Sequence, residues 1–217
     1  MKKVYISLAI GFGFIINGFS QVTFNVTLGI SPGYHPSTVG LLVNKEKPDE
    51  EFIFNMTEVR VQYFAGMNAQ LQLTKPFFVE FGLNYSKRSM TYQVEYSVLN
   101  NDHTIAQYEM KESDHILTMP VNVGVKIDAF DVVTGLRVFR SIGFSSDLNH
   151  MPEYKSNQQL FRMGWQGGIG YNLSGTRIGI EFESQFSRVG NGKSISNHSL
   201  ELMNIPSQFT FTIQRKL

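Results

Sequence analysis

The feature that most constrains the fold of this chain is an alternation of apolar and polar residues along most of its length. It is clearest from Phe161 to Leu173, where apolar residues occupy every second position except Gly167, and polar residues or glycines lie between them. Successive side chains of a β-strand point to opposite faces, so this period of two predicts a strand with one apolar face. The pattern resumes after Ser174-Gly175, and the two strands are predicted to form a β-hairpin.

The same alternation recurs along the rest of the chain after residue 21, and no segment shows a convincing helical period. Each alternating segment carries aliphatic or aromatic residues on one face and mostly glycine, amide, hydroxyl or charged residues on the other. With the hairpin included, the sequence predicts eight strands, at residues 22–30, 59–73, 77–85, 117–127, 136–144, 161–173, 178–186 and 208–214.

Connections between these strands alternate in length. Short turns are expected at residues 74–76, 128–131 and 174–175, and long loops at 32–58, 100–114, 147–159 and 189–197. Short turns on one side and long loops on the other are typical of outer-membrane β-barrels, whose turns face the periplasm. We therefore expect an all-β fold, an eight-stranded antiparallel up-and-down transmembrane β-barrel over residues 21–217, with periplasmic termini and extracellular loops.

The composition of the two strand faces predicts which of them lies inside. An eight-stranded barrel leaves an interior only wide enough for side chains, which suits the small and polar face, whereas the bulky apolar face suits lipid. Arg140 is the one charged residue in the apolar sets, and its position near the outer interface allows its side chain to snorkel. A secreted soluble β-barrel with the faces reversed, which would bind a small ligand, is an alternative.

Four of the six glycines of the hairpin are explained by the same assignment of faces. Gly164, Gly168, Gly170 and Gly179 fall on the inner face, where small residues make room for long polar neighbours. A dinucleotide fingerprint would need G-x-G-x-x-G at the start of a helix, and neither the spacing nor a helical period is present. The glycine cluster therefore predicts no phosphate site.

The N-terminal residues have the features of a secretory signal peptide. Two lysines precede an apolar run from Val4 to Ile16, and the small residues Gly18 and Ser20 match a cleavage site after Ser20. The apolar run is shorter than the roughly 20 residues that a membrane-spanning helix needs. Residues 1–20 are therefore expected to be cleaved on export, which together with the barrel predicts residence in the bacterial outer membrane.

Composition argues against several classes of function. The chain has no cysteine, hence no disulfide and no cysteine nucleophile, and its net charge of +1 gives no footprint for nucleic acid. Its five histidines fall in or beside the predicted loops without the spacing of metal ligands. Asp102-His103 and Asp114-His115 could be halves of a hydrolase or acyltransferase triad at the barrel rim, but neighbouring strand residues point to opposite faces. We expect no cofactor, and a rim-sited lipid-modifying enzyme is only a minor alternative.

Three segments of the chain resemble PorT-like outer-membrane β-barrels. The strand HILTMPVNVGVKI, from His115 to Ile127, carries Pro120 between aliphatic residues and is followed by a tight turn. The signal peptide that ends at Ser20 and the terminal strand SQFTFTIQRKL are also similar. The resemblance implies a small eight-stranded barrel in contact with outer-membrane lipid and lipopolysaccharide and inserted by the barrel-assembly machinery. It implies no single activity.

Charged residues on the inner face are expected to fill the barrel and not to catalyse a reaction. Arg137 and the two residues Glu181 and Glu183 have inward parity at similar heights, and Glu80 and Lys126 lie nearer the turns on neighbouring strands. Unpaired charges in so narrow a space are costly, so we expect these five side chains to form a network of ion pairs. The expected protein is a monomeric barrel with a side-chain-filled lumen and a structural or surface-interaction role, neither pore nor enzyme.

A second candidate site is a hairpin that protrudes outside the cell. Alternation continues from Ser89 to Val98 with the opposite parity from the residues before it, which predicts a bulge or a shift near Lys87-Arg88. Residues 86–114 would then form a hairpin whose exposed edge could add a strand from an extracellular protein partner. Its candidate binding residues are Tyr92, Val94, Tyr96 and Tyr108. A surface adhesion or partner-binding barrel is therefore the main alternative function.

Overall fold

The computed structural model describes residues 22–33, 39–44, 50–98, 101–147, 160–186, 194–195, 198–201 and 207–217. All regular secondary structure in these residues is β-strand, and the strands form one antiparallel sheet. In the same part of the chain, no helix is long and apolar enough to cross a membrane. The predicted signal peptide, residues 1–20, lies outside the described residues.

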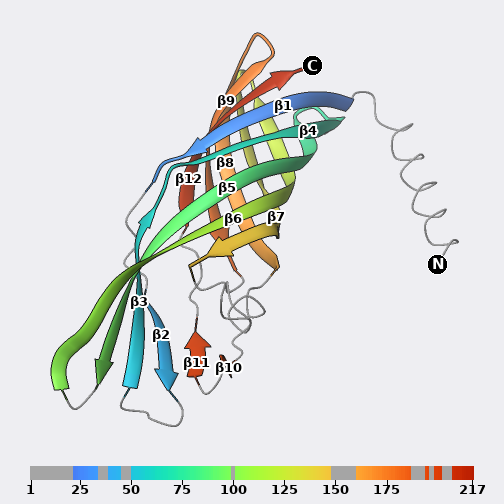
Figure 1. The fold of residues 1–217 in the computed structure, drawn as a ribbon. Coiled ribbons are helices and arrows are strands. Elements are labelled where there is room, and N and C mark those ends of the chain that lie inside the picture. Colours follow the sequence, from blue (N-terminus) through green and yellow to red (C-terminus); the bar gives the residue numbers. More distant parts are fainter. Residues whose placement is uncertain are drawn as a thin grey trace, which may run out of the picture.

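Eight strands of this sheet close into a ring (Figure 1). Each pairs antiparallel with its two neighbours, and the ring closes where β1 pairs with β12, with Ile30 opposite Phe211. The eight predicted strands are thereby confirmed. Their bounds are β1 (Val22–Ser31), β4 (Gln62–Thr74), β5 (Phe77–Val98), β6 (Asn101–Ile127), β7 (Phe130–Ser146), β8 (Phe161–Leu173), β9 (Thr176–Gln185) and β12 (Gln208–Lys216).

Three tight turns join strands at one end of the ring, which we call the turn end. They lie at residues 75–76, 128–129 and 174–175. Ser174 and Gly175 both have positive φ, 46° and 81°, which is the backbone of a two-residue hairpin turn and which glycine adopts without strain. The first and last described strands also meet here, since the backbone N–H of Leu217 donates to Phe24 O at 3.0 Å.

At the opposite end, which we call the loop end, the sheet continues beyond the ring (Figure 1). β5 and β6 extend as a long hairpin, and four further strands join them: β2 (Val39–Asn44), β3 (Glu50–Val59), β10 (Ser194–Ile195) and β11 (His198–Glu201). The order in this protruding sheet is β10, β11, β2, β3, β5 and β6. The predictions of long loops at 32–58, 100–114 and 189–197 are therefore wrong in part, because each of these segments contains strand residues.

The bulge or shift predicted near Lys87-Arg88 is not in β5 itself. The pairing of β5 with β6 keeps one register from Phe77 to Tyr96, so Arg88 and the residues after it keep the inward parity of Ser86. What changes at this point is the composition of the inner face, which is mostly polar within the ring and mostly apolar beyond it. The buried apolar residues of the protruding sheet are Met56, Val59, Met90, Tyr92, Val94 and Met110. The irregularity lies in the neighbouring chain segment, where Arg60 and Val61 separate β3 from β4.

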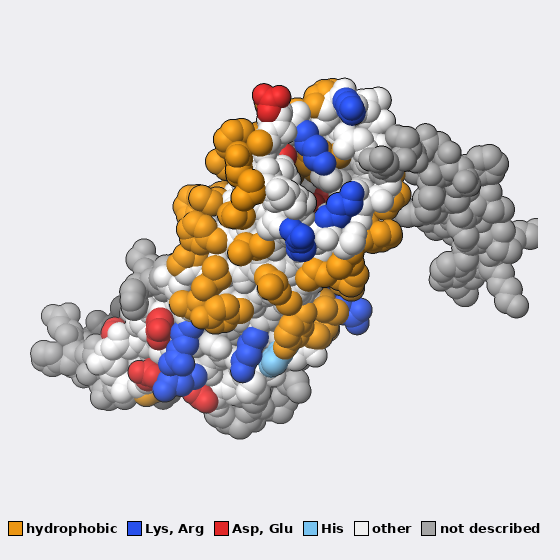
Figure 2. Space-filling view, turned by 90° about the horizontal axis from the view of Figure 1, so that it is seen from above, with side chains coloured by type: hydrophobic (Ala, Val, Ile, Leu, Met, Phe, Trp, Pro, Cys, Tyr) orange, Lys and Arg blue, Asp and Glu red, His pale blue; other side chains and the backbone are white. Residues whose placement is uncertain are grey.

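The ring buries polar side chains and exposes apolar ones, the inverse of a water-soluble fold. Inward-facing Asn122 and Thr212 are each 1% exposed, whereas outward-facing Ile169 and Val123 are 59% and 56% exposed. Hydrophobic side chains spread over the outer wall, and acidic and basic side chains gather together near the protruding end (Figure 2). The fold thus presents two places for a functional site, the polar interior and the protruding sheet.

Candidate functional site

The interior of the ring and its loop-end mouth concentrate buried charge. Four arginines and six carboxylic acids are at most 8% exposed in the described part of the chain. We call this set the interior network: Arg88, Arg137, Arg162, Arg177, Glu80, Glu112, Asp114, Asp131, Glu181 and Glu183. Because a buried charge without a partner is strongly destabilising, the pairing of these groups decides whether the interior is stable.

Glu183 on β9 is the centre of the interior network toward the loop end. Arg137 on β7 donates from Nη1 to Glu183 Oε2, and Nη2 of Arg88 on β5 lies 3.5 Å from Glu183 Oε1. Gln208 on β12 donates its side-chain amide to the same carboxylate. Arg88 also donates from Nε to Gln62 Oε1 at 3.2 Å. One carboxylate therefore links four strands of the ring.

Arg177, also on β9, is the centre of the interior network toward the turn end. Its Nε donates to Asp131 Oδ1 at 2.8 Å, and its Nη1 donates to Glu181 Oε1 at 3.3 Å. Asn172 donates to the second oxygen of Asp131 at 2.7 Å. Two carboxylates thus hold this guanidinium in one position, and the network has two centres, one at each end.

Arg137 was expected to pair with both Glu181 and Glu183, and it pairs with Glu183 alone among these two. Arg137 and Glu183 are joined directly across the strand that separates them, where their parity and height place them. Glu181 pairs instead with Arg177, four residues before it on the same strand. This corrects the expectation that Glu181 and Glu183 share Arg137.

Glu80 and Lys126, the other two predicted members, each have an amide partner instead of each other. Asn122 donates to Glu80 Oε1 at 3.2 Å, and Lys126 Nζ donates to Gln70 Oε1 at 2.9 Å. Gln166 donates in turn to Asn122 Oδ1 at 2.6 Å. Amide side chains therefore carry the network across the middle of the interior, between its two charged centres.

Further members of the interior network lie at the mouth of the ring, at its loop end. Arg162 Nη2 donates to Asp114 Oδ2 at 2.6 Å, and Ser141 donates to the other oxygen of the same carboxylate. Ser146 donates to Glu112 Oε1 at 2.8 Å. These contacts close the polar interior beneath the apolar side chains of the protruding sheet.

Sequence reasoning missed six members of the interior network: Arg88, Arg162, Arg177, Glu112, Asp114 and Asp131. Parity alone would have found two of them, since Arg162 and Arg177 each lie two residues before an inward-facing glycine. The bulge or shift predicted near Lys87-Arg88 hid Arg88, and the loop predicted at residues 100–114 hid Glu112 and Asp114, because both predictions removed these residues from the register of the ring. Asp131 was placed in a turn and not in a strand.

Two of the inner-face glycines make room for Arg177. A Cβ on Gly170 would lie 2.3 Å from Arg177 Nε, and one on Gly179 would lie 2.7 Å from Arg177 Nη1. The guanidinium cannot move aside easily, because Asp131 and Glu181 hold it. At Gly164 and Gly168 the obstacle is the backbone of β9, with oxygen atoms 2.5 Å and 2.7 Å from the added Cβ. Glycine at these four positions therefore lets the strands of the ring lie close to Arg177 and to the backbone of β9.

Little free volume is left around Glu183. A cavity of about 10 Å³ lies among side chains that include Arg88, Arg137 and Glu183, which is about the space of one water molecule. A wider polar vestibule of about 230 Å³ opens at the turn end beside Lys126 and Arg177. The interior network therefore fills the ring at the level of Glu183.

The predicted binding residues of the hairpin are divided between buried and exposed positions. Tyr92 and Val94 have inward parity and are 9% and 0% exposed, which corrects the expectation that they are available to a partner. Tyr108, opposite Val94 on β6, is 43% exposed. The side chain of Tyr96 lies outside the described residues. Burial, with the nearby Glu112 carboxylate, raises the pKa of Tyr92 well above its usual value.

The candidate catalytic doublet Asp114-His115 is split between two faces. Asp114 binds Arg162 inside the ring, and His115 Nδ1 lies 2.6 Å from the Tyr85 hydroxyl on the outer wall. The side chains of Asp102 and His103 lie outside the described residues. Among the side chains that are described, no group of three His, Cys, Asp or Glu residues could hold a metal ion.

Comparison with known proteins assigns no family: no family model matches the chain, and no curated protein is significantly similar to it. The fold, the inverted polarity and the interior network therefore carry the functional argument alone.

Proposed function

We propose that the chain is an integral β-barrel protein of the bacterial outer membrane. The observation that supports this proposal is the polarity of the ring, with buried arginines and carboxylates inside and exposed aliphatic and aromatic side chains outside. Each Å² of apolar surface left in water costs about 25 cal/mol, whereas a lipid environment accepts it. A closed ring also pairs the backbone groups of every strand, which the hydrocarbon core of a membrane requires.

The orientation in the membrane follows from the two ends of the ring. The turn end and both chain termini would face the periplasm, and the protruding sheet would stand outside the cell. The alternative of a secreted soluble barrel with a small ligand is less well supported, because such a barrel needs an apolar interior and the interior network is charged.

The role we propose is structural or surface-interacting, and neither that of a pore nor of an enzyme. Each of the four arginines of the interior network is paired with a carboxylate, and the network occupies the lumen at the level of Glu183. The partners are outer-membrane lipid, lipopolysaccharide and the barrel-assembly machinery, and the barrel is a monomer.

Cell fractionation combined with gel mobility tests this proposal. We expect the protein in the outer-membrane fraction, and we expect faster migration of the unboiled sample than of the boiled sample, because a closed barrel resists detergent at room temperature. The control is a periplasmic protein and a known outer-membrane barrel from the same cells. Recovery of the chain as a soluble periplasmic protein would end the proposal.

A second candidate function is the capture of an extracellular protein by the protruding sheet. β6 forms one edge of this sheet, because its residues before Glu112 pair with β5 on one side and with no described strand on the other (Figure 1). An exposed strand edge can add a partner strand through backbone hydrogen bonds. Tyr108 on this edge strand is exposed and could contribute a side-chain contact.

A shortened hairpin tests the second candidate without disturbing the ring. Thr91 and Lys111 are directly opposite each other, so Asn-Gly can replace residues 92–110 as a two-residue turn. We expect the shortened protein to remain in the outer membrane and to lose adhesion to other cells or to an immobilised surface protein. Equal adhesion by the full-length and shortened proteins would exclude the hairpin as the binding element.

A further inference from the structure

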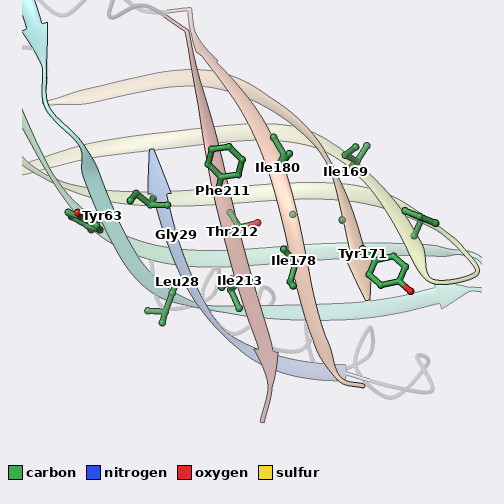
Figure 3. Close-up of a pocket in the computed structure, with 14 residues that line it drawn as sticks. Leu28, Gly29, Tyr63, Ile169, Tyr171, Ile178, Ile180, Phe211, Thr212 and Ile213 are labelled. Atoms are coloured by element: carbon green, nitrogen blue, oxygen red, sulfur yellow. The ribbon is translucent and has the colours of Figure 1, made fainter. Parts of the chain in front are cut away.

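The outer wall of the ring has an apolar groove that neither the interior network nor the protruding sheet explains. The groove has a volume of about 620 Å³ and crosses six strands, from β7 through β8, β9, β12 and β1 to β4. The side chains that form its walls point outward from these strands and are all hydrophobic (Figure 3). A concave apolar site of this size falls within the range of ligand-binding pockets.

Two rows of outward-facing side chains form the walls of the groove. One row begins at Phe130 and ends at Leu28, and the other begins at Ile169 and ends at Tyr63. Within each row, neighbours lie directly opposite one another on adjacent strands. The floor between the rows is formed by Gly170, Gly179, Thr212 and Gly29, which are also opposite one another.

The dimensions of the groove fit one extended acyl chain. Six strands at about 4.8 Å spacing give a length of about 24 Å across the sheet. Strands of such barrels tilt by about 45°, so the groove would climb about 17 Å along the membrane normal. One leaflet contributes about 15 Å, half of the hydrocarbon core.

The floor of the groove is held from inside the ring. A Cβ on Gly29 would lie 2.1 Å from the ring of Phe64, and a Cβ on Gly170 would meet Arg177. The strands under the groove therefore lie in close contact with side chains inside the ring. One of these, Arg177, is held in place by two carboxylates. A groove backed in this way exists before any ligand binds.

Charge distinguishes the two ends of the groove. Lys87 is the next residue in the row after Tyr63, directly opposite it on β5, and is exposed. At the other end, exposed Asp128 lies two residues before Phe130. Arg215 lies beside the middle of the groove, but its guanidinium is bonded to Thr176 Oγ1 at 2.6 Å and to Ser174 O at 3.1 Å. An anionic headgroup is therefore favoured at the Lys87 end and disfavoured at the Asp128 end.

We propose that this groove binds one membrane lipid with an anionic headgroup, with an acyl chain along the groove and the headgroup against Lys87. The bound lipid belongs to the leaflet next to the protruding sheet. This assignment rests on the proposed membrane location and adds to it a single specific lipid site.

Native mass spectrometry of the full mature protein tests the site. The probes are dioleoyl phosphatidylglycerol, which is anionic, and dioleoyl phosphatidylcholine, which is zwitterionic, each presented in mixed detergent micelles. We expect the protein to retain one phosphatidylglycerol. Lys87→Gln should weaken retention of phosphatidylglycerol about fivefold, the effect of one lysine beside an anionic surface, and should leave phosphatidylcholine unchanged. Ile180→Trp, which fills the groove, should reduce retention of both lipids.

Two variants outside the groove serve as matched controls. Lys75→Gln removes an exposed lysine at the turn end, and Val123→Trp places a tryptophan on the outer wall at β6, away from the groove. Both variants should retain lipid as the unaltered protein does. If Ile180→Trp fails the test of heat-modifiable mobility, Leu28→Phe is the second filling variant.

Equal lipid retention in every variant overturns the site, and so does a dimer without lipid, since a second copy would then occupy the groove. Either result would leave outer-membrane residence intact. Recovery of the protein as a soluble periplasmic species is the distinct outcome that refutes the membrane location itself.

Discussion

Arg137 on β7 and Glu183 on β9 meet inside the ring across β8, although 46 residues separate them in the sequence. The same carboxylate receives Arg88 from β5 and Gln208 from β12. A single acidic residue thus connects strands from both halves of the chain. This arrangement can form only when the ring is closed, so the interior network reports on closure.

We predict strong energetic coupling between Arg137 and Glu183. Glu183→Gln alone should lower the free energy of unfolding by roughly 3–5 kcal/mol, because it leaves the buried Arg137 guanidinium without its carboxylate. Arg137→Met should cost less, because Arg88 and Gln208 remain bound to Glu183. The double variant should lose much less than the sum of the two. The measurement is urea-induced unfolding in lipid vesicles, followed by the fluorescence of Trp165, the one tryptophan of the chain.

The exposed pair of Arg60 and Glu58 supplies the control for this cycle. Their side chains are 57% and 42% exposed and their charged atoms 3.7 Å apart, so Arg60→Gln should cost at most about 1 kcal/mol. Strictly additive losses for Arg137→Met and Glu183→Gln would show that the two side chains do not interact.

Glu181 and Glu183 should behave as members of different clusters, although both lie on β9 with the same parity. We expect Glu181→Gln to be coupled strongly to Arg177→Met and more weakly to Arg137→Met, because Glu181 is bonded to Arg177 and not to Arg137. Three double-variant cycles in the same urea assay separate these pairs. Coupling of Glu181 with Arg137 as large as that of Glu183 with Arg137 would contradict the two-centre description.

The ring of eight strands should not conduct as an open pore. The interior network fills the lumen at the level of Glu183, where the remaining cavity is about 10 Å³. Planar bilayer recordings of the reconstituted protein should therefore show no large and stable single-channel currents, whereas a trimeric porin prepared in the same way should. Stable currents from the unaltered protein would mean that the network opens in the membrane.

Much of the architecture was predictable because each strand of the ring turns one face to the mostly polar interior and the other to the apolar outer wall. Period two identified all eight ring strands, and the parity of Arg137 and Glu183 placed them together. Prediction failed where the inner face changes composition at Arg88, since a change of polarity along a continuous strand looks the same as a bulge in sequence. It also failed at β2 and β3, whose pairing depends on how far β5 extends beyond the ring.

Tyr92 should make the stability of the protruding sheet sensitive to high pH. Its pKa in the folded protein is raised, chiefly by burial, so the folded state keeps the proton when the unfolded state begins to lose it, near pH 10. Stability that is present below that pH is then lost as the pH rises further. Raising the pH from about 9 to about 11 should destabilise the unaltered protein more than Tyr92→Phe, as measured by urea unfolding. Equal losses in the two proteins would exclude Tyr92 as the cause.

Gly170→Ala should destabilise the ring, because the interior network leaves no room for a Cβ. The added atom would lie 2.3 Å from Arg177 Nε and 2.7 Å from Asp131 Oδ1, which are bonded to each other, so the ion pair or the wall must shift. The expected cost is about 1–3 kcal/mol in urea unfolding, typical of overpacking. Gly143→Ala is the matched control in a neighbouring strand, since its nearest contact is 3.5 Å from His115 Cβ, and it should be close to neutral. If Gly170→Ala is as stable as Gly143→Ala, the strand or the buried ion pair can shift to accommodate a Cβ. Arg177 then does not require the glycines of this strand.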